Sequence, residues 1–237
     1  MSGHSKWSKI KRAKGANDAK KGAIFTKLSK LITVAARNGG DPDMNFTLRI
    51  AIDKARAANM PKDNIDRAVK KGAGESGDGQ IYELTYEGLG PDNSQFIVKC
   101  LTDNRNRTAA NIRHLFGKFG GSLSQVAWNF DLKGVIMISI EAIKDVDWEE
   151  LQLELIDLDI EDLIKEEEGI TIYTQPKDLQ KVNQFLESKG LVVESADIEY
   201  IAKEKKEAGA SQEKIEKFIE ALEEDEDVEN YYTNIDI

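Results

Sequence analysis

Apolar residues in the first third of the chain recur at the spacing of amphipathic helices. Between residues 18 and 38 they return every three or four positions, which places them on one helix face. The Asn-Gly-Gly-Asp run at 38–41 then predicts the end of this helix, because glycine tolerates the left-handed C-terminal conformation. The same pattern predicts a second helix over about 45–59 and a short third helix from Pro61 to Gly72.

The pattern changes to alternation after a cluster of glycine and serine at 72–79, which we interpret as a linker. Residues 81–90 and 94–103 alternate as strands do and are joined by a Gly-Pro-Asp-Asn turn. Residues 104–121 then predict a helix, and strand character returns within 124–141.

The next stretch reads strand, helix, strand, strand, helix, strand, which matches the split β-α-β or ferredoxin-like plan. A last helix at 211–225 and a strand near 227–235 have no partner in that unit, so we expect them to complete the preceding one. The predicted fold is α+β, with an N-terminal helical domain and two ferredoxin-like α/β domains, the third inserted into the second. The expected boundaries are 1–75 for the helical domain, 76–133 and 205–237 for the discontinuous α/β domain, and 134–204 for the inserted one.

Charge is distributed very unevenly along this pattern. Residues 1–75 contain 17 basic and 7 acidic side chains, a balance of +10, whereas the whole chain carries −10. The remainder therefore carries −20. This asymmetry favours a polyanion-binding end joined to an acidic body. The alternative is that the two parts attract one another.

The candidate nucleic-acid-binding residues lie in three segments. The N-terminal arm, residues 3–22, places an aromatic ring among cations before any carboxylate appears; its candidates are His4, Lys6, Trp7, Lys9, Lys11, Arg12 and Lys14. Its Lys and Arg can neutralise phosphates, and Trp7 either stacks on a base or staples the arm onto the first helices. The first helix adds a cationic stripe, because steps of seven, three and seven residues preserve direction: Lys20, Lys27, Lys30 and Arg37.

The third basic segment is the run Thr-Asp-Asn-Arg-Asn-Arg-Thr at 102–108. Arg105 and Arg107 stand near a predicted helix N-terminus, where free backbone N–H groups favour an anion. Alternatively, Asp103 caps this helix and pairs with an arginine.

Residues typical of catalysis or metal binding are sparse. One cysteine and two widely spaced histidines do not predict a zinc site, and neither a phosphate loop nor a nucleophile elbow is present. The acidic runs at 165–169 and 223–229 are interpreted as solvated edges. No apolar run approaches the roughly 20 residues of a membrane span. We therefore expect a cytoplasmic protein that is not an enzyme, with no cofactor, no metal and no membrane partner.

Several motifs together resemble the YebC/PmpR family: GHSKW, KGANDAKKGAIFTKL, LRIAIDKARAANMPKDNIDRAVKKGAG, YEGLGP, LTDNRNRT and DVENYYTN. The resemblance implies three domains and a cytoplasmic, non-enzymatic regulator of gene expression. Some members are described as DNA-binding transcription factors, and others resemble ribosome-associated translation factors. The family's usual Gly-Pro-Gly-Gly turn is Gly-Pro-Asp-Asn here, at 90–93.

The leading hypothesis is a transcriptional regulator that binds DNA through its basic surface. The alternatives are a translation factor that binds ribosomal RNA or the ribosome, and an adaptor whose acidic α/β domains bind protein partners. A stripe made mostly of lysine suits phosphates better than base edges, which from the residues alone slightly favours RNA.

Overall fold

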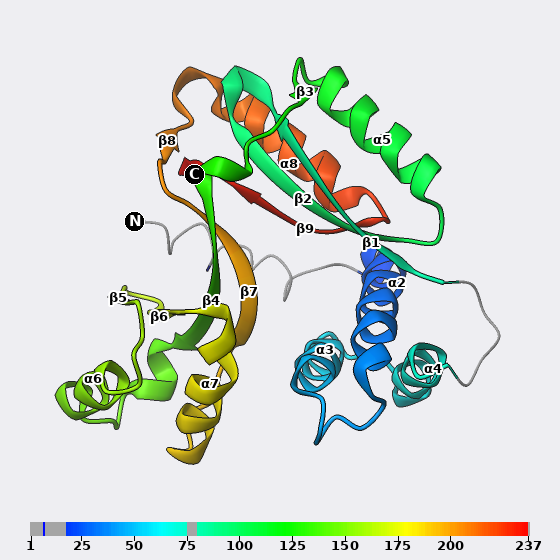
Figure 1. The fold of residues 1–237 in the computed structure, drawn as a ribbon. Helices are drawn as coiled ribbons and strands as arrows, with labels where there is room; N and C mark the ends of the chain where they lie inside the picture. The colour runs from blue at the N-terminus through cyan, green and yellow to red at the C-terminus, as the bar shows by residue number, and fades with distance from the viewer. Residues whose placement is uncertain (1–6, 8–17, 75–79, 237) are drawn as a thin grey trace. The chain divides into compact units, whose positions relative to one another are not determined.

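The computed structural model describes Trp7, residues 18–74 and residues 80–236, with the side chains of 18–20 left out. Its described residues form two compact units. The larger unit contains residues 18–129 and 204–236, and the inserted unit contains Trp7 and residues 130–203 (Figure 1). The chain thus leaves the larger unit once and returns to it. Residues 18–72 belong to the larger unit together with a sheet, so a separate helical domain at 1–75 stays a prediction.

Three helices of the larger unit confirm the helical pattern: α2 (Asp18–Ala35, extended by the 3-10 turn Ala36–Asn38), α3 (Phe46–Ala57) and α4 (Lys62–Gly72). Ile32, Leu48 and Ile65 are among the buried residues they share. Asn45 caps α3 by accepting a hydrogen bond from the Leu48 amide, and its side-chain amide donates to the Ala35 carbonyl at 2.8 Å. This one side chain therefore links the end of α2 to the first turn of α3.

Gly72 is the last residue of α4, and its backbone is not left-handed; Ala73 occupies the C-cap. A Cβ atom on Gly72 would lie 2.2 Å from the carbonyl oxygen of Thr33 and 2.6 Å from the Cβ of Ala36. Glycine is required because α2 and α4 approach each other closely at this point.

The sheet of the larger unit has the order β3-β1-β2-β9, and its strands are antiparallel. The elements are β1 (Tyr82–Leu89), β2 (Gln95–Thr102), α5 (Arg105–Lys118), β3 (Ser122–Leu123), α8 (Gln212–Glu224) and β9 (Val228–Thr233), with a parallel pair β8 (Lys206–Glu207) and β10 (Ile235–Asp236). Helix α8 and strand β9 follow the insertion, and β9 pairs with β2, so the last strand joins the first sheet as expected. The chain order differs from the split β-α-β plan, because β1 precedes the other strands of this sheet yet occupies the third strand's place.

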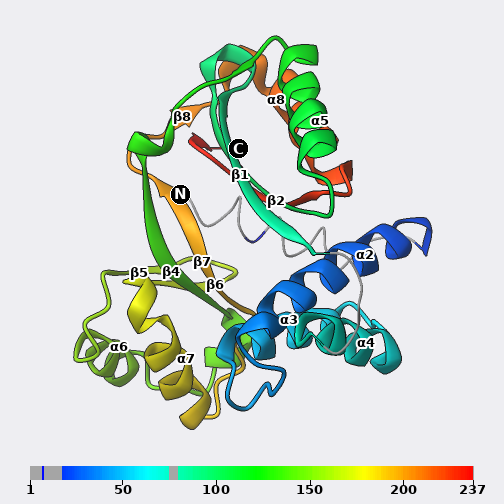
Figure 2. The ribbon, with the colours of Figure 1, turned by 45° about the vertical axis from the view of Figure 1, so that its right-hand side comes forward.

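Helices α5 and α8 contact each other over this sheet (Figure 2). Three phenylalanines fill the space between helices and sheet. The ring of Phe218 lies edge-on to Phe96 at 4.9 Å and to Phe116 at 5.0 Å between centroids. Since Phe218 follows the insertion and the other two precede it, this cluster joins the two halves of the unit.

The inserted unit follows the predicted split β-α-β order. Its elements are β4 (Phe130–Ser139), α6 (Trp148–Ile156), β5 (Asp162–Lys165), β6 (Gly169–Thr174), α7 (Leu179–Ser188) and β7 (Ser195–Ala202). The sheet order β5-β6-β4-β7 is antiparallel throughout, which is the ferredoxin-like arrangement. Residues 130–203 of this unit lie close to the predicted segment 134–204.

Replacing Phe218 by Ala should lower the free energy of unfolding by about 3–5 kcal/mol, because the substitution leaves a cavity among three rings. Urea denaturation monitored by circular dichroism measures this decrease. The matched control is Leu153→Ala, since Leu153 is 66% exposed and should change stability by no more than about 0.5 kcal/mol. Equal effects of the two substitutions would contradict the role of the aromatic cluster.

Candidate nucleic-acid interface

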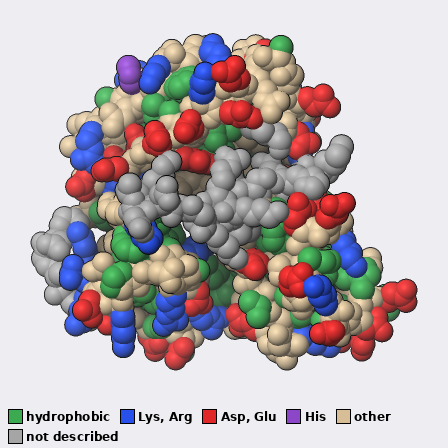
Figure 3. Space-filling view, turned by 180° about the vertical axis from the view of Figure 1, so that it is seen from behind, with side chains coloured by type: hydrophobic (Ala, Val, Ile, Leu, Met, Phe, Trp, Pro, Cys, Tyr) green, Lys and Arg blue, Asp and Glu red, His purple; other side chains and the backbone are tan. Residues whose placement is uncertain are grey.

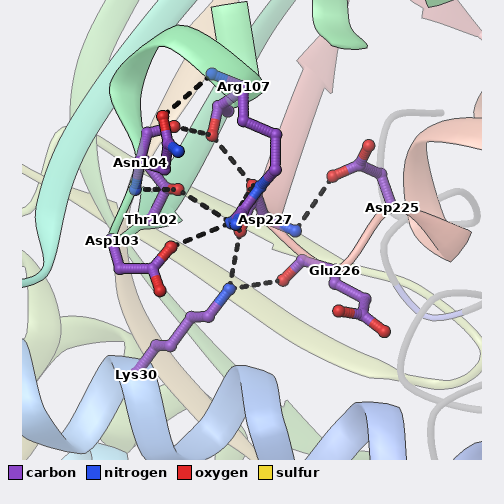
Figure 4. A network of polar contacts seen from close by, with 9 residues as sticks. Lys30, Thr102, Asp103, Asn104, Arg107, Asp225, Glu226 and Asp227 are labelled. Carbon is purple, nitrogen blue, oxygen red and sulfur yellow. Dashed lines mark hydrogen bonds and ion pairs between the residues drawn. The ribbon is translucent and has the colours of Figure 1, made fainter.

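A buried carboxylate, Asp227, organises the cations of the larger unit (Figure 4). Its side chain is 4% exposed. One oxygen accepts a hydrogen bond from Lys30 Nζ at 2.7 Å, and the other accepts from Arg107 Nη2 at 3.0 Å and Thr108 Oγ1 at 2.8 Å. The carboxylate of Asp227 therefore binds both α2, through Lys30, and the first turn of α5, through Arg107 and Thr108.

The backbone around Asp227 holds the carboxylate in this place. Its carbonyl accepts the Leu101 amide at 2.8 Å, which ties the residue to the end of β2. Its amide donates to Asp225 Oδ1 at 2.9 Å. On the other side, Asn104 caps α5 by accepting the Arg107 amide at 3.1 Å. Asn104 is thus the cap, whereas Asp103 pairs with Arg107 Nη2 at 2.9 Å.

The protonation of Asp227 follows from these interactions. Burial alone would raise the pKa of its carboxyl, but hydrogen bonds from Lys30, Thr108 and Arg107 outweigh burial and lower the pKa below its ordinary value of 3.8. The Arg107 guanidinium, hydrogen-bonded to Asp227, has a raised pKa in turn. Asp227 is therefore an ionised carboxylate at neutral pH.

The neighbouring lysines also bind backbone carbonyls of the acidic turn that links α8 to β9, residues 223–227. Lys27 Nζ donates to the Glu223 carbonyl at 2.6 Å, and Lys30 Nζ donates to the Glu226 carbonyl at 3.0 Å. The Glu223 carbonyl belongs to the last turn of α8, where cations are favoured. Burial lowers the pKa of Lys27, although nearby carboxylates oppose the shift. The side chains of these two lysines of α2 therefore connect the helix to the acidic turn.

The other predicted cations have different surroundings. The guanidinium of Arg37 donates to the Ile81 carbonyl. Arg105 lies over the Tyr82 ring, with its guanidinium carbon 4.1 Å from the centroid. Among the described residues, no carboxylate pairs with Arg105. In the basic segment 102–108, the charge of Arg105 is therefore not compensated by a described carboxylate, whereas Asp103 and Asp227 compensate that of Arg107.

Trp7 is 5% exposed, so its ring is not available for base stacking in this conformation. Its described neighbour is Gly169 in β6 of the inserted unit. A Cβ on Gly169 would lie 2.7 Å from the Trp7 ring atom Cζ2, so the indole packs directly on the glycine. The indole Nε1 is buried without a hydrogen-bond acceptor in the part of the chain described.

The structure brings Lys27, Lys30 and Arg107 together around one acidic turn, while Arg37, Arg105 and Trp7 lie elsewhere. His4, Lys6, Lys9, Lys11, Arg12 and Lys14 lie outside the described residues, as does the side chain of Lys20. Phosphate binding by this whole set stays a prediction. The interpretation of 223–229 as a solvated edge is wrong for Asp227, because that carboxylate is buried against two cations.

Further cations lie on the surface of α3 and α4, and Figure 3 shows Lys and Arg side chains gathered where these helices lie, at its lower left. Four exposed members of this set are Arg56, Lys62, Arg67 and Lys70. Arg56 pairs with Asp53 at 3.0 Å. Within residues 18–74 and 80–236, no ion pair engages the other three, so they add uncompensated charge to this face.

The described part of the chain holds no group of three or more metal-ligating side chains. None of its helices is long and apolar enough to span a membrane. Burial raises the pKa of the Cys100 thiol to about 12, so this thiol is protonated and a poor nucleophile at neutral pH.

Comparison with known proteins identifies the family. One family model, described as the N-terminal domain of the TACO1/YebC protein, matches residues 5–75, and a second, described as TACO1/YebC second and third domain, matches residues 81–235. The chain belongs to the TACO1/YebC family. The two relatives described next are each named a probable transcriptional regulatory protein.

Individual relatives match over almost their whole length. A protein of Bacillus licheniformis is 50% identical over 241 residues, with 99% of this chain and 100% of that protein covered. One of Thermoanaerobacter pseudethanolicus is 45% identical over 242 residues, covering 100% and 98%. The crystal structure of a conserved hypothetical protein from Aquifex aeolicus superposes with a TM-score of 0.81 at 40% identity, covering 93% of this chain and 92% of that one.

Replacing Asp227 by Asn should lower the free energy of unfolding by about 3 kcal/mol, because Lys30 and Arg107 would lose the charge that compensates them in a buried place. Urea denaturation measures the change. Glu226→Gln is the matched control: it removes one exposed carboxylate of the same turn and should cost no more than about 0.5 kcal/mol. Equal destabilisation by both variants would show that only the turn's overall charge matters.

The stabilisation by Asp227 should also depend on pH with a defined sign. Because its pKa is lower in the folded protein, the stabilisation is complete above the ordinary value of 3.8 and is lost as the pH falls through the depressed pKa. Asn at this position does not titrate. The difference in unfolding free energy between the wild type and Asp227→Asn should therefore stay constant from about pH 7 to about pH 5 and shrink as the pH falls further toward the depressed pKa. A difference that stays constant below about pH 4 would contradict the assignment.

Proposed function

We propose that this protein is a non-enzymatic regulator of gene expression that binds nucleic acid, with duplex DNA as its target, through the basic surface of its first 75 residues. The observation that carries the proposal is the separation of charge: 17 basic against 7 acidic side chains there, in a chain whose net charge is −10. The regulatory name of its relatives agrees with this role.

The described interactions refine which cations form the interface. Lys27, Lys30 and Arg107 already bind the acidic turn, so their charges are compensated within the chain. The proposed interface consists of the arm cations together with the exposed cations of α4. A phosphate backbone is bound by several such side chains at once, each of which displaces a condensed counterion. This arrangement favours affinity over sequence reading.

The choice between DNA and RNA depends on the kind of side chain. Reading a DNA sequence in the major groove requires polar side chains such as Asn or Arg on a helix that enters the groove. The exposed cations of α4 are Lys62, Arg67 and Lys70, a mixture that positions phosphates. The second candidate function is therefore a translation factor that binds ribosomal RNA.

Replacing Lys9, Lys11, Arg12 and Lys14 by Ala should weaken binding and flatten the slope of log affinity against log salt by about 0.7–0.9 for each phosphate that is no longer neutralised. Fluorescence anisotropy with a labelled DNA duplex and a labelled RNA hairpin over a salt series measures both slopes. The tighter ligand at equal salt decides between DNA and RNA.

The control variant replaces four exposed lysines outside the interface by Ala: Lys177, Lys181, Lys205 and Lys214. It removes the same total charge. If both quadruple variants have the same slope, the arm is not the binding element. If neither nucleic acid binds the wild type, the remaining hypothesis is an adaptor whose acidic domains bind proteins.

A further inference from the structure

The sheet of the inserted unit has two different faces. Gly134 of β4 faces α7, since a Cβ there would lie 3.0 Å from the Cβ of Leu179. Side chains alternate along a strand, so Val135 and Met137 point to the opposite face. Their cross-strand partners on β6 are Tyr173 and Thr171. Figure 1 shows α6 and α7 on the same side of this sheet, so neither of these two helices covers the second face.

This second face is nevertheless buried. The row of four side chains, Val135, Met137, Thr171 and Tyr173, is between 1% and 4% exposed. Gly169 continues this row, because it lies two residues before Thr171 on the same strand and opposite Ser139. Trp7 packs on Gly169 and so occupies this end of the face. A glycine in a strand suits such an approach because it lets an aromatic ring lie against the backbone.

Charge around this face complements the arm. Glu166, Glu167 and Glu168 directly precede Gly169, and β7 places Asp197 opposite Val135 and Glu199 opposite Lys133. Trp7 is flanked in sequence by Lys6, Lys9 and further cations of the arm. Carboxylates and phosphates attract the same lysine and arginine side chains.

We propose that the second face of the β5-β6-β4-β7 sheet, opposite α6 and α7, is a docking site for the chain's own N-terminal arm, anchored by Trp7 on Gly169, and that docking competes with nucleic acid for the arm. The competition rests on the function proposed above, whereas the docking does not. While Trp7 is seated on Gly169, its ring cannot stack on a base. Nucleic acid then binds the undocked fraction of the protein, which lowers the apparent affinity.

The burial of the Trp7 indole carries a free-energy cost that favours undocking. The indole Nε1 is buried without an acceptor in the described part of the chain. An N–H group that loses water and gains no partner costs free energy. Undocking restores the hydration of this N–H group, so the cost of burying it offsets part of the stabilisation that the indole gains by packing. Thr171 Oγ1 is likewise buried without a partner among the described residues, on the same face.

Docking is tested without nucleic acid by fluorescence of Trp7. In a Trp128→Phe, Trp148→Phe background Trp7 is the single tryptophan. Its emission should be blue-shifted and protected from acrylamide. Adding Thr171→Lys places a long cation on the docking face and should raise the quenching constant about threefold or more and shift the emission to the red. Val192→Lys adds the same charge at an exposed position and should change neither.

The quenching constants of the two lysine variants can also contradict the docking. Equal quenching in Thr171→Lys and Val192→Lys, with native circular dichroism in both, would show that Trp7 does not depend on this face. Strong quenching of Trp7 in the Trp128→Phe, Trp148→Phe protein itself would also contradict the docking, because it would show that the ring is exposed. If Thr171→Lys fails to fold, Met137→Lys on the neighbouring strand replaces it in the same comparison.

Competition is tested by affinity. Trp7→Ala should bind the DNA duplex or RNA hairpin about tenfold more tightly than the wild type, because about one molecule in ten would be undocked before the change. Trp7→Phe keeps a ring on Gly169 and should give a smaller gain. Weaker or unchanged binding by Trp7→Ala would overturn the competition and would favour a stacking role for Trp7. Absence of binding in the wild type would refute the proposed function, while the quenching result would still decide the docking.

Discussion

The carboxylate of Asp227 is the point on which the larger unit depends. It precedes β9 by one residue, follows the segment that returns from the inserted unit, and accepts hydrogen bonds from α2 and α5. A buried charge is tolerated only when partners replace the lost water, and three donors do so here. The helices before the sheet are thereby tied to its last strand. Part of the opposition between a basic N-terminal end and an acidic remainder is resolved inside the molecule.

The elements of the fold could be predicted from hydrophobic periodicity because each is encoded locally. That β9 joins the first sheet followed from counting strands, since the split β-α-β unit leaves one helix and one strand over. The position of β1 could not be derived in this way, because hydrophobic periodicity does not encode which strands pair, and β1 pairs with both β2 and β3. The reason for Gly72 was also hidden, since it lies in the approach of Thr33 from another helix. Asp227 was missed for the same reason: its partners are 119 to 197 residues away, and its own neighbours form an ordinary acidic run.

The acidic turn and a phosphate backbone are chemically similar binding partners for the lysines of α2. Both offer anionic oxygens and further acceptors at hydrogen-bond distance, and the Glu223 and Glu226 carbonyls extend the set that Asp227 begins. A cationic stripe deduced from helical geometry is therefore not evidence of an external ligand by itself. Tertiary structure decides which anionic or carbonyl oxygens each lysine of α2 contacts. The same consideration applies to Trp7, whose position among cations suggests stacking while its burial on Gly169 shows packing.

Pairing of the arm's cations with carboxylates of the same chain would also change how the salt dependence of nucleic-acid binding is interpreted. The slope of log affinity against log salt counts the counterions that the nucleic acid and protein release. An arm whose cations already lie beside carboxylates exchanges one anionic partner for another, and salt weakens the docked state as well as the complex. Under the proposed docking, the slope of the wild type is therefore smaller than the number of neutralised phosphates, and Trp7→Ala, which begins undocked, has the steeper slope. A stacking Trp7 gives no such steepening, because the removal of an uncharged ring releases no counterions.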